Sequence, residues 1–283
     1  MTGRSTTPVT ATHMVMQVTS VVDAIQPVSC CSAFYEQDWV RHLAEDIFHP
    51  GGEELTKKTI AAMNLHPGAG IADLGCGTGT SALILAAEPG LNISAIDISA
   101  DNIRRAQDRL SAANRAPGNV RFQQADAHEL PFEDAEFDGV LAECTFSLFA
   151  NQQAVLAEIK RVLKPDGQLG ITDMAVGGPL PEDIASVVAP WTCLMDAVDQ
   201  QAYSDTFTRA GFAIREFSDE STGLTRLIST LKRKLLMLGV GTALTGVDAP
   251  QIDIGEIKHW LDRFNEEVEK GTIRYLRFNL QKT

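Results

Sequence analysis

The feature that most constrains the fold is a loop with glycine at every second position, residues 75–79. The apolar run 69–74 before it is typical of a short buried strand, and residues 80–87 after it are typical of a helix. Glycine lets the backbone turn tightly and approach a ligand, and the start of the helix offers unpaired N–H groups. The pattern therefore predicts a strand, loop and helix unit of an α/β fold in which the loop can bind a small molecule.

A second strand and its terminal acid support ligand binding. Residues 92–96 predict this strand, and Asp97 follows at the distance from the loop where nucleotide-binding α/β units place an acid on ribose hydroxyls. The loop departs from the pyrophosphate-binding pattern because Asp73 precedes its first glycine. An acid there disfavours a pyrophosphate and suits a ligand that carries an ammonium or sulfonium group. The sequence therefore favours S-adenosylmethionine over NAD.

The stretch Asp73-Leu74-Gly75-Cys76-Gly77-Thr78-Gly79 resembles the first motif of class I S-adenosylmethionine-dependent methyltransferases. The resemblance implies an α/β fold with a Rossmann-like seven-stranded sheet and helices on both faces. In that family the loop and its acid hold the methionine part, the acid after the second strand holds the ribose, and an acid after the third contacts adenine. The implied cofactor site consists of Asp73, Gly75, Cys76, Gly77, Gly79, Asp97, Ile98, Asp126, Ala127 and Glu143.

The chain divides into four predicted parts. They are an N-terminal arm with a helical cap, a core that binds S-adenosylmethionine, a helical insertion and the last strand of the core, at residues 1–52, 53–218, 219–270 and 271–283. The insertion is a departure from the family, because the return from the sixth strand to the seventh is usually a short hairpin. We expect helices in it at 232–238 and 257–268.

Composition and charge limit the partners. A net charge of −13 argues against a nucleic-acid groove, because phosphate contacts need clustered Lys and Arg. The longest apolar stretch, 235–247, is too short and too rich in glycine and threonine to cross a bilayer, and no segment is typical of an export signal. We therefore expect a cytoplasmic protein with a small-molecule or metalloid substrate, no membrane partner, and cysteines kept as thiols.

Three segments bear on the methyl acceptor. Residues 143–148, 180–184 and 191–194 resemble the arsenite S-adenosylmethionine methyltransferases. In that family one cysteine after the fourth strand, and another after a Leu-Pro-Glu-Asp-like turn and a tryptophan, bind trivalent arsenic. The resemblance places these catalytic, arsenite-binding roles on Cys144 and Cys193.

The family pattern is incomplete in this chain. Its members commonly carry another cysteine just after the glycine loop, where this sequence has Thr80 and Ser81. A third thiol would therefore come from Cys31 or Cys30. Soft thiolates prefer a soft thiophilic centre, and arsenic held by them keeps a lone pair that can attack the sulfonium methyl without a general base. A thiol reductant could then take part.

Three functional hypotheses remain open from the sequence. The first is methyl transfer to arsenite or another soft thiophilic acceptor. The second is methyl transfer to a small organic acceptor, as in the related quinone C-methyltransferases, with Cys144 and Cys193 as packing residues. An oxygen or nitrogen acceptor would need a base, and His128 is the histidine expected closest to the cleft. The third is a non-catalytic protein that binds S-adenosylmethionine or a metalloid.

Overall fold

The computed structural model describes residues 49–87, 90–113, 119–189, 192–245 and 254–283. The predicted N-terminal arm and nearly all of the predicted cap lie outside the described residues, as do Cys30 and Cys31. Their predicted roles therefore stay predictions.

A single seven-stranded sheet organises the described residues, with the strand order β3-β2-β1-β4-β5-β7-β6. The strands are β1 (Gly70–Leu74), β2 (Asn92–Asp97), β3 (Val120–Gln124), β4 (Phe137–Glu143), β5 (Leu163–Val176), β6 (Phe212–Asp219) and β7 (Ile273–Lys282). Strands β1 to β5 pair in parallel, whereas β7 runs antiparallel to both β5 and β6. The predicted fold class is confirmed.

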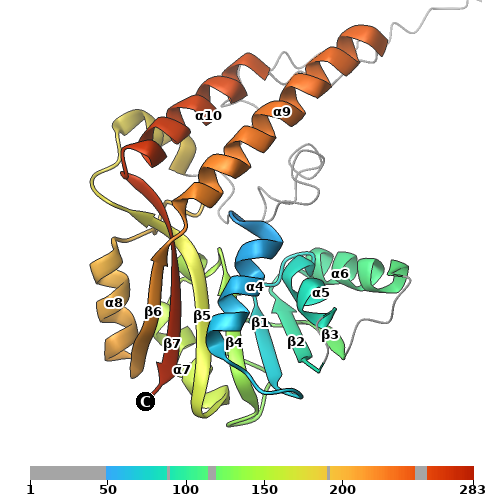
Figure 1. The fold of residues 1–283 in the computed structure, drawn as a ribbon, viewed down its shortest axis with the longest axis vertical. Coiled ribbons are helices and arrows are strands. Elements are labelled where there is room, and N and C mark those ends of the chain that lie inside the picture. Colours follow the sequence, from blue (N-terminus) through green and yellow to red (C-terminus); the bar gives the residue numbers. More distant parts are fainter. Residues whose placement is uncertain (1–48, 88–89, 114–118, 190–191, 246–253) are drawn as a thin grey trace, which may run out of the picture.

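Helices cover both faces of this sheet (Figure 1). They are α4 (Gly52–Met63), α5 (Thr80–Ala86), α6 (Ala100–Ala112), α7 (Gln152–Val162), α8 (Gln200–Arg209), α9 (Ser221–Thr245) and α10 (Ile254–Glu269). Apolar residues of α4, α5 and α6 share one buried cluster with β1 and β2, and residues of α7 and α8 share another with β4, β5 and β7. Two short segments that the sequence reading missed are the 3₁₀ turn η1 (Phe146–Leu148) and the π-helical turn η2 (Ile184–Val188).

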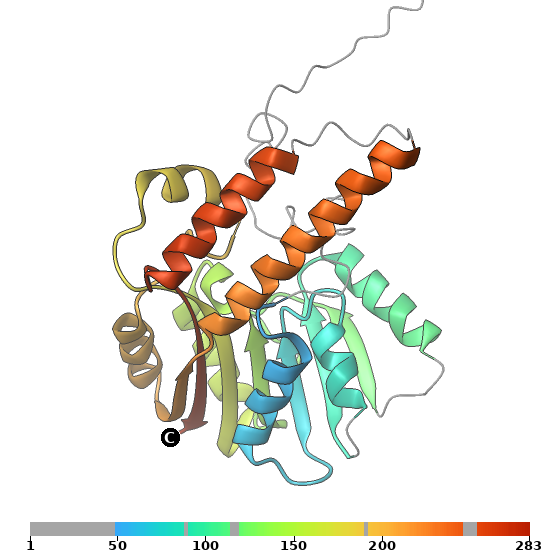
Figure 2. The same cartoon turned by 45° about the horizontal axis from the view of Figure 1, so that its top comes forward.

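The insertion before the last strand is a pair of packed helices. Figures 1 and 2 both place α9 and α10 beyond the end of the sheet where β6 finishes and β7 begins. The expected helix at 232–238 was too short, since α9 begins at Ser221. Its first turns are rich in Ser, Thr and Gly, which form helices weakly alone, but Leu224 and Ile228 are buried with Phe264 of α10. Tertiary packing therefore sets the length of α9.

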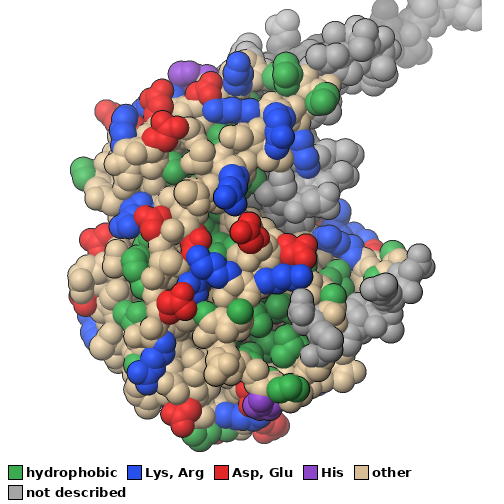
Figure 3. All heavy atoms as spheres, in the orientation of Figure 1, with side chains coloured by type: hydrophobic (Ala, Val, Ile, Leu, Met, Phe, Trp, Pro, Cys, Tyr) green, Lys and Arg blue, Asp and Glu red, His purple; other side chains and the backbone are tan. Residues whose placement is uncertain are grey.

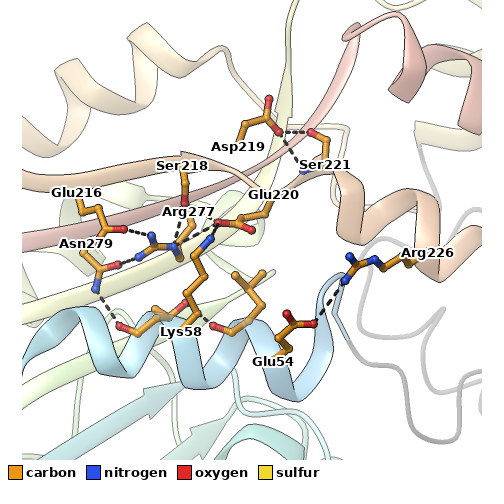
Figure 4. Close-up of polar contacts among 12 residues, drawn as sticks. Glu54, Lys58, Glu216, Ser218, Asp219, Glu220, Ser221, Arg226, Arg277 and Asn279 are labelled. Atoms are coloured by element: carbon orange, nitrogen blue, oxygen red, sulfur yellow. Dashed lines mark hydrogen bonds and ion pairs between the residues drawn. The ribbon is translucent and has the colours of Figure 1, made fainter.

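A buried arginine lies where the insertion joins the sheet, and its contacts stabilise this junction (Figure 4). The Arg277 side chain on β7 is fully buried, and its guanidinium pairs with Glu216 and donates from Nε to Ser218 Oγ at 3.0 Å. Lys58 of α4 donates to Glu220 Oε1 at 2.6 Å, just before α9 begins. These contacts join β6, β7, α4 and the start of α9.

The described surface carries both charge signs. On the face shown in Figure 3, Lys and Arg side chains are interspersed with Asp and Glu. Within the described residues, no helix combines the length and apolar character needed to cross a membrane.

Candidate active site

A cavity of about 950 Å³ lies at the carboxyl ends of β1, β2 and β4. Ligands of open α/β sheets bind at this end of the strands. The predicted cofactor residues that line it are Asp73, Gly75, Cys76, Gly77, Asp97, Ile98, Asp126, Ala127 and Glu143. Cys144 also lines it, whereas Gly79 and Cys193 do not.

The glycine loop has a backbone that only glycine adopts easily. Gly75, Gly77 and Gly79 have φ values of 69°, 54° and 81°, in the left-handed region. A Cβ at Gly75 would collide with Thr145, and a Cβ at Gly79 would lie 2.7 Å from the ring of Phe122. Gly79 therefore serves close packing at the start of α5, while Gly75 and Gly77 face the cavity.

Asp97 organises the loop in addition to lining the cavity. Its Oδ2 accepts from the Gly77 N–H at 2.9 Å, and its Oδ1 accepts from the Ser99 N–H at 2.8 Å and from Asn102 Nδ2 at 3.2 Å. A carboxylate offers about four acceptor positions, so one remains for a ligand. The next residue, Ile98, is apolar yet 60% exposed on the cavity wall, where it offers a flat apolar contact.

Two buried carboxylates lack a partner on one oxygen. Asp73 Oδ2 and Glu143 Oε1 have no hydrogen bond among the described residues. Burial, with the neighbouring charges of Glu143 and Asp97, raises the pKa of Asp73 well above its ordinary range. Buried carboxylates without a partner are costly, and a bound cation would relieve that cost. These two carboxylates therefore fit the positively charged ammonium and sulfonium groups of S-adenosylmethionine.

The sequence did not predict which side chains surround the Glu143 carboxylate. Glu143 Oε2 accepts from Ser81 Oγ at 2.7 Å and from Thr56 Oγ1 at 2.9 Å, and His49 Nε2 lies 3.4 Å away. His49 also approaches Pro50 O through Nδ1 at 3.1 Å and is only 5% exposed. Residues 49–52 are typical of a turn that ends the segment before them, but nothing local indicates that His49 reaches the end of a strand far along the chain.

His128 lies on the cavity wall rather than in an open loop. Its Nδ1 is 2.6 Å from Asp126 Oδ1, while its Nε2 accepts from the Asn151 N–H at 3.2 Å. From these contacts we assign Nδ1 as the donor to Asp126 and Nε2 as the acceptor from Asn151. Hydrogen bonds from His128 lower the pKa of Asp126.

The structure brings Cys144 and Cys193 together. Their Sγ atoms lie 3.6 Å apart, although the residues are 49 positions apart in sequence. Cys193 is buried, whereas Cys144 is half-buried and has a φ of 53°, which is uncommon for a residue with a side chain. No group of three or more His, Cys, Asp or Glu residues in the described part of the chain is arranged to hold a metal ion.

Fold and cavity together define a class I methyltransferase that uses S-adenosylmethionine. The model of a methyltransferase domain family matches residues 65–211, and the chain belongs to this family.

Known proteins extend this comparison. The chain is 30% identical to the O-methyltransferase resE of Aspergillus sclerotiorum over 71% of this chain and 76% of that protein. It is 31% identical to an arsenite methyltransferase of Halobacterium salinarum, over 58% of this chain and 42% of that protein. Its fold is similar to a phosphoethanolamine N-methyltransferase from Haemonchus contortus, with a TM-score of 0.74 and 18% identity over 90% of this chain and 60% of that chain.

Proposed function

We propose that this methyltransferase transfers the methyl group of S-adenosylmethionine to a hydroxyl of a small organic acceptor. The observation that carries this proposal is the similarity to an O-methyltransferase over about three quarters of both chains, 71% and 76%. The match to an arsenite methyltransferase spans less of each chain, 58% and 42%. The proposal therefore replaces arsenite, the leading hypothesis from the sequence, with the organic acceptor that stood second.

The cavity residues divide into cofactor-binding roles in this proposal. Asp73 and Glu143 would face the positive methionine part, because each has an unpaired buried oxygen. Asp97 would accept from one ribose hydroxyl through its remaining acceptor position. Ile98 would contact adenine with its exposed apolar surface, and Asp126 would lie near the adenine edge.

S-adenosylmethionine supplies an electrophilic methyl group on its sulfonium. The chain holds donor and acceptor in line and excludes water, effects that can contribute on the order of 7–11 kcal/mol. A hydroxyl acceptor must also lose its proton. His128 is the candidate to receive it, because it lines the cavity and Asp126 orients its ring. The Nε2 lone pair accepts from the Asn151 N–H at 3.2 Å, so this hydrogen bond would have to break before Nε2 takes the proton from the acceptor oxygen.

A second candidate is methyl transfer to arsenite. The 3.6 Å between the Cys144 and Cys193 sulfurs favours it, since two thiols at this separation can bind one thiophilic atom. The third ligand would have to be Cys30 or Cys31, or a thiol reductant.

The cytoplasmic location and the absence of a nucleic-acid partner stay predictions.

Calorimetry of S-adenosylmethionine binding tests the cofactor assignment. Asp97→Asn keeps the side-chain shape but removes the charge that accepts three hydrogen bonds. Charged hydrogen bonds contribute about 1.5–3 kcal/mol, so affinity should fall about 10- to 150-fold. The matched control is Asp166→Asn, at an exposed position near the start of β5 where φ is 60° and asparagine is tolerated. Equal affinity in both variants would refute the assignment.

A further inference from the structure

We propose that Cys144 and Cys193 form a reversible disulfide and so make an oxidation site in the wall of the cavity. This modification does not depend on the identity of the acceptor. The two Sγ atoms are 3.6 Å apart, and a disulfide requires about 2.05 Å. Closing the remaining gap of roughly 1.5 Å requires the two side chains to rotate toward each other.

The backbones on both sides of the pair are anchored. The Cys144 N–H donates to Thr172 O at 2.7 Å. The single proton of Ser147 Oγ is shared between Asp173 Oδ1 at 2.8 Å and the carbonyl oxygen of Cys193 at 3.3 Å, and Asp173 also accepts from the Ser147 N–H at 2.6 Å. The two thiols are therefore held side by side by hydrogen bonds to β5 and η1, rather than meeting by chance motion of loops.

The two thiols differ in exposure and therefore have different roles in the oxidation. Cys144 lines the cavity, so a small oxidant such as hydrogen peroxide can reach it. Its thiolate attacks one peroxide oxygen, which gives a sulfenic acid and releases water after protonation. The Cys193 thiol, 2% exposed, then attacks the sulfenic sulfur and releases a second water. One peroxide thus accepts two electrons, one from each sulfur, and the products are one disulfide and two water molecules.

Cross-linking would change the surface that faces the acceptor. The Cys144 sulfur would move from the cavity wall toward the buried cluster that contains Cys193 and Leu194, and that also includes Leu224 and Phe264 of the insertion. A displacement of about 1 Å near reacting groups can cost roughly 100-fold in rate. We expect methyl transfer to slow in the oxidised protein. S-adenosylmethionine should still bind, because Asp73 and Asp97 lie on other strands and the Glu143 side chain beside Cys144 stays held by Ser81 and Thr56.

Peptide mapping after peroxide treatment of the full chain tests the site directly. Trypsin should release residues 122–160 joined to residues 162–209, and two of the five thiols should be lost to titration under denaturing conditions. Dithiothreitol should restore both thiols. Cys144→Ser and Cys193→Ser should each abolish the joined peptide, and Cys144→Ala with Cys193→Ala provide a second pair if either serine variant fails to fold.

Two outcomes would overturn the proposal. One is a link from Cys144 or Cys193 to Cys30 or Cys31, and the other is oxidation of Cys144 to a sulfinic acid without any cross-link. The effect on transfer is measured as the ratio of rates before and after peroxide, which should fall in the wild type and stay constant in both serine variants. A cross-linked protein with an unchanged rate would refute the effect on catalysis. The cross-link itself is read by mass, so its result stands apart from whether an organic hydroxyl is the acceptor.

Discussion

Replacing Asp73 by asparagine should have opposite effects on folding and on cofactor binding. The carboxylate is buried, one of its oxygens has no partner among the described residues, and burial beside Glu143 and Asp97 raises its pKa. In the ligand-free protein this charge is therefore a cost. In the complex it should become an attraction, because the cofactor brings positive charge to the same place.

The expected changes in melting temperature and in cofactor affinity follow from the surroundings of Asp73 without and with the ligand. Relief of one unpaired buried group corresponds to about 1–3 kcal/mol, so Asp73→Asn should unfold at a temperature higher by at least about 2–4 °C near pH 7. Because the folded-state pKa of Asp73 is raised, the wild type is more stable when this group is protonated and loses that stability as pH rises through the raised pKa. The difference from the variant should shrink as the pH is lowered. Affinity for S-adenosylmethionine should fall about 10- to 150-fold, from the loss of about 1.5–3 kcal/mol.

Thermal melts across pH and calorimetric titrations of the same two proteins measure both effects. Asp166→Asn again serves as control, since Asp166 is exposed near the start of β5. A variant that melts lower than the wild type without ligand would show that Asp73 supports the fold. Unchanged affinity would show that this carboxylate does not face the positive part of the cofactor. Either result would refute the reasoning.

Three further expectations concern other groups. His128→Asn should lower kcat more than it raises KM in steady-state assays with a hydroxyl acceptor, and equal effects on both would indicate a binding role. Arg277→Met should destabilise the protein by about 1–3 kcal/mol in urea unfolding, because it leaves buried polar partners unpaired, whereas Arg215→Met on the exposed face of β6 should have little effect. Burial raises the pKa of Asp173 from 3.8 to about 6, so stability should drop by up to about 3 kcal/mol as pH rises from about 3 to about 7, and Asp173→Asn should lack this drop.

Local patterns were enough to predict the sheet and many of the residues that line the cavity at its strand ends. The strand, loop and helix around Gly75 and Gly77, and the acid at Asp97, follow from apolar periodicity and from the special conformations that glycine adopts. Parallel strands bring their carboxyl ends to one edge, which is why the predicted residues after β1, β2 and β4 line one cavity. The same rule put Cys144 at that edge.

Contacts between distant segments could not be predicted in the same way. Thr56 is 87 positions before Glu143, and no local pattern shows that its hydroxyl reaches that carboxylate. The burial of Arg277 depends on partners from β6, which no periodicity on β7 reveals. The length of α9 also escaped prediction, because packing against α10 outweighs the weak helix propensity of its first turns.

The central claim, methyl transfer to an organic hydroxyl, is tested most directly by following a labelled methyl group. The purified protein would be incubated with S-adenosylmethionine carrying a ¹³C methyl, and with small phenols and alcohols, arsenite and selenite in separate reactions. We expect the label to appear by NMR as an oxygen-bound methyl on at least one hydroxyl compound, and we expect Cys144→Ser and Cys193→Ser to retain this signal. Label found only on arsenic, and lost in both serine variants, would contradict the claim and restore arsenite as the acceptor.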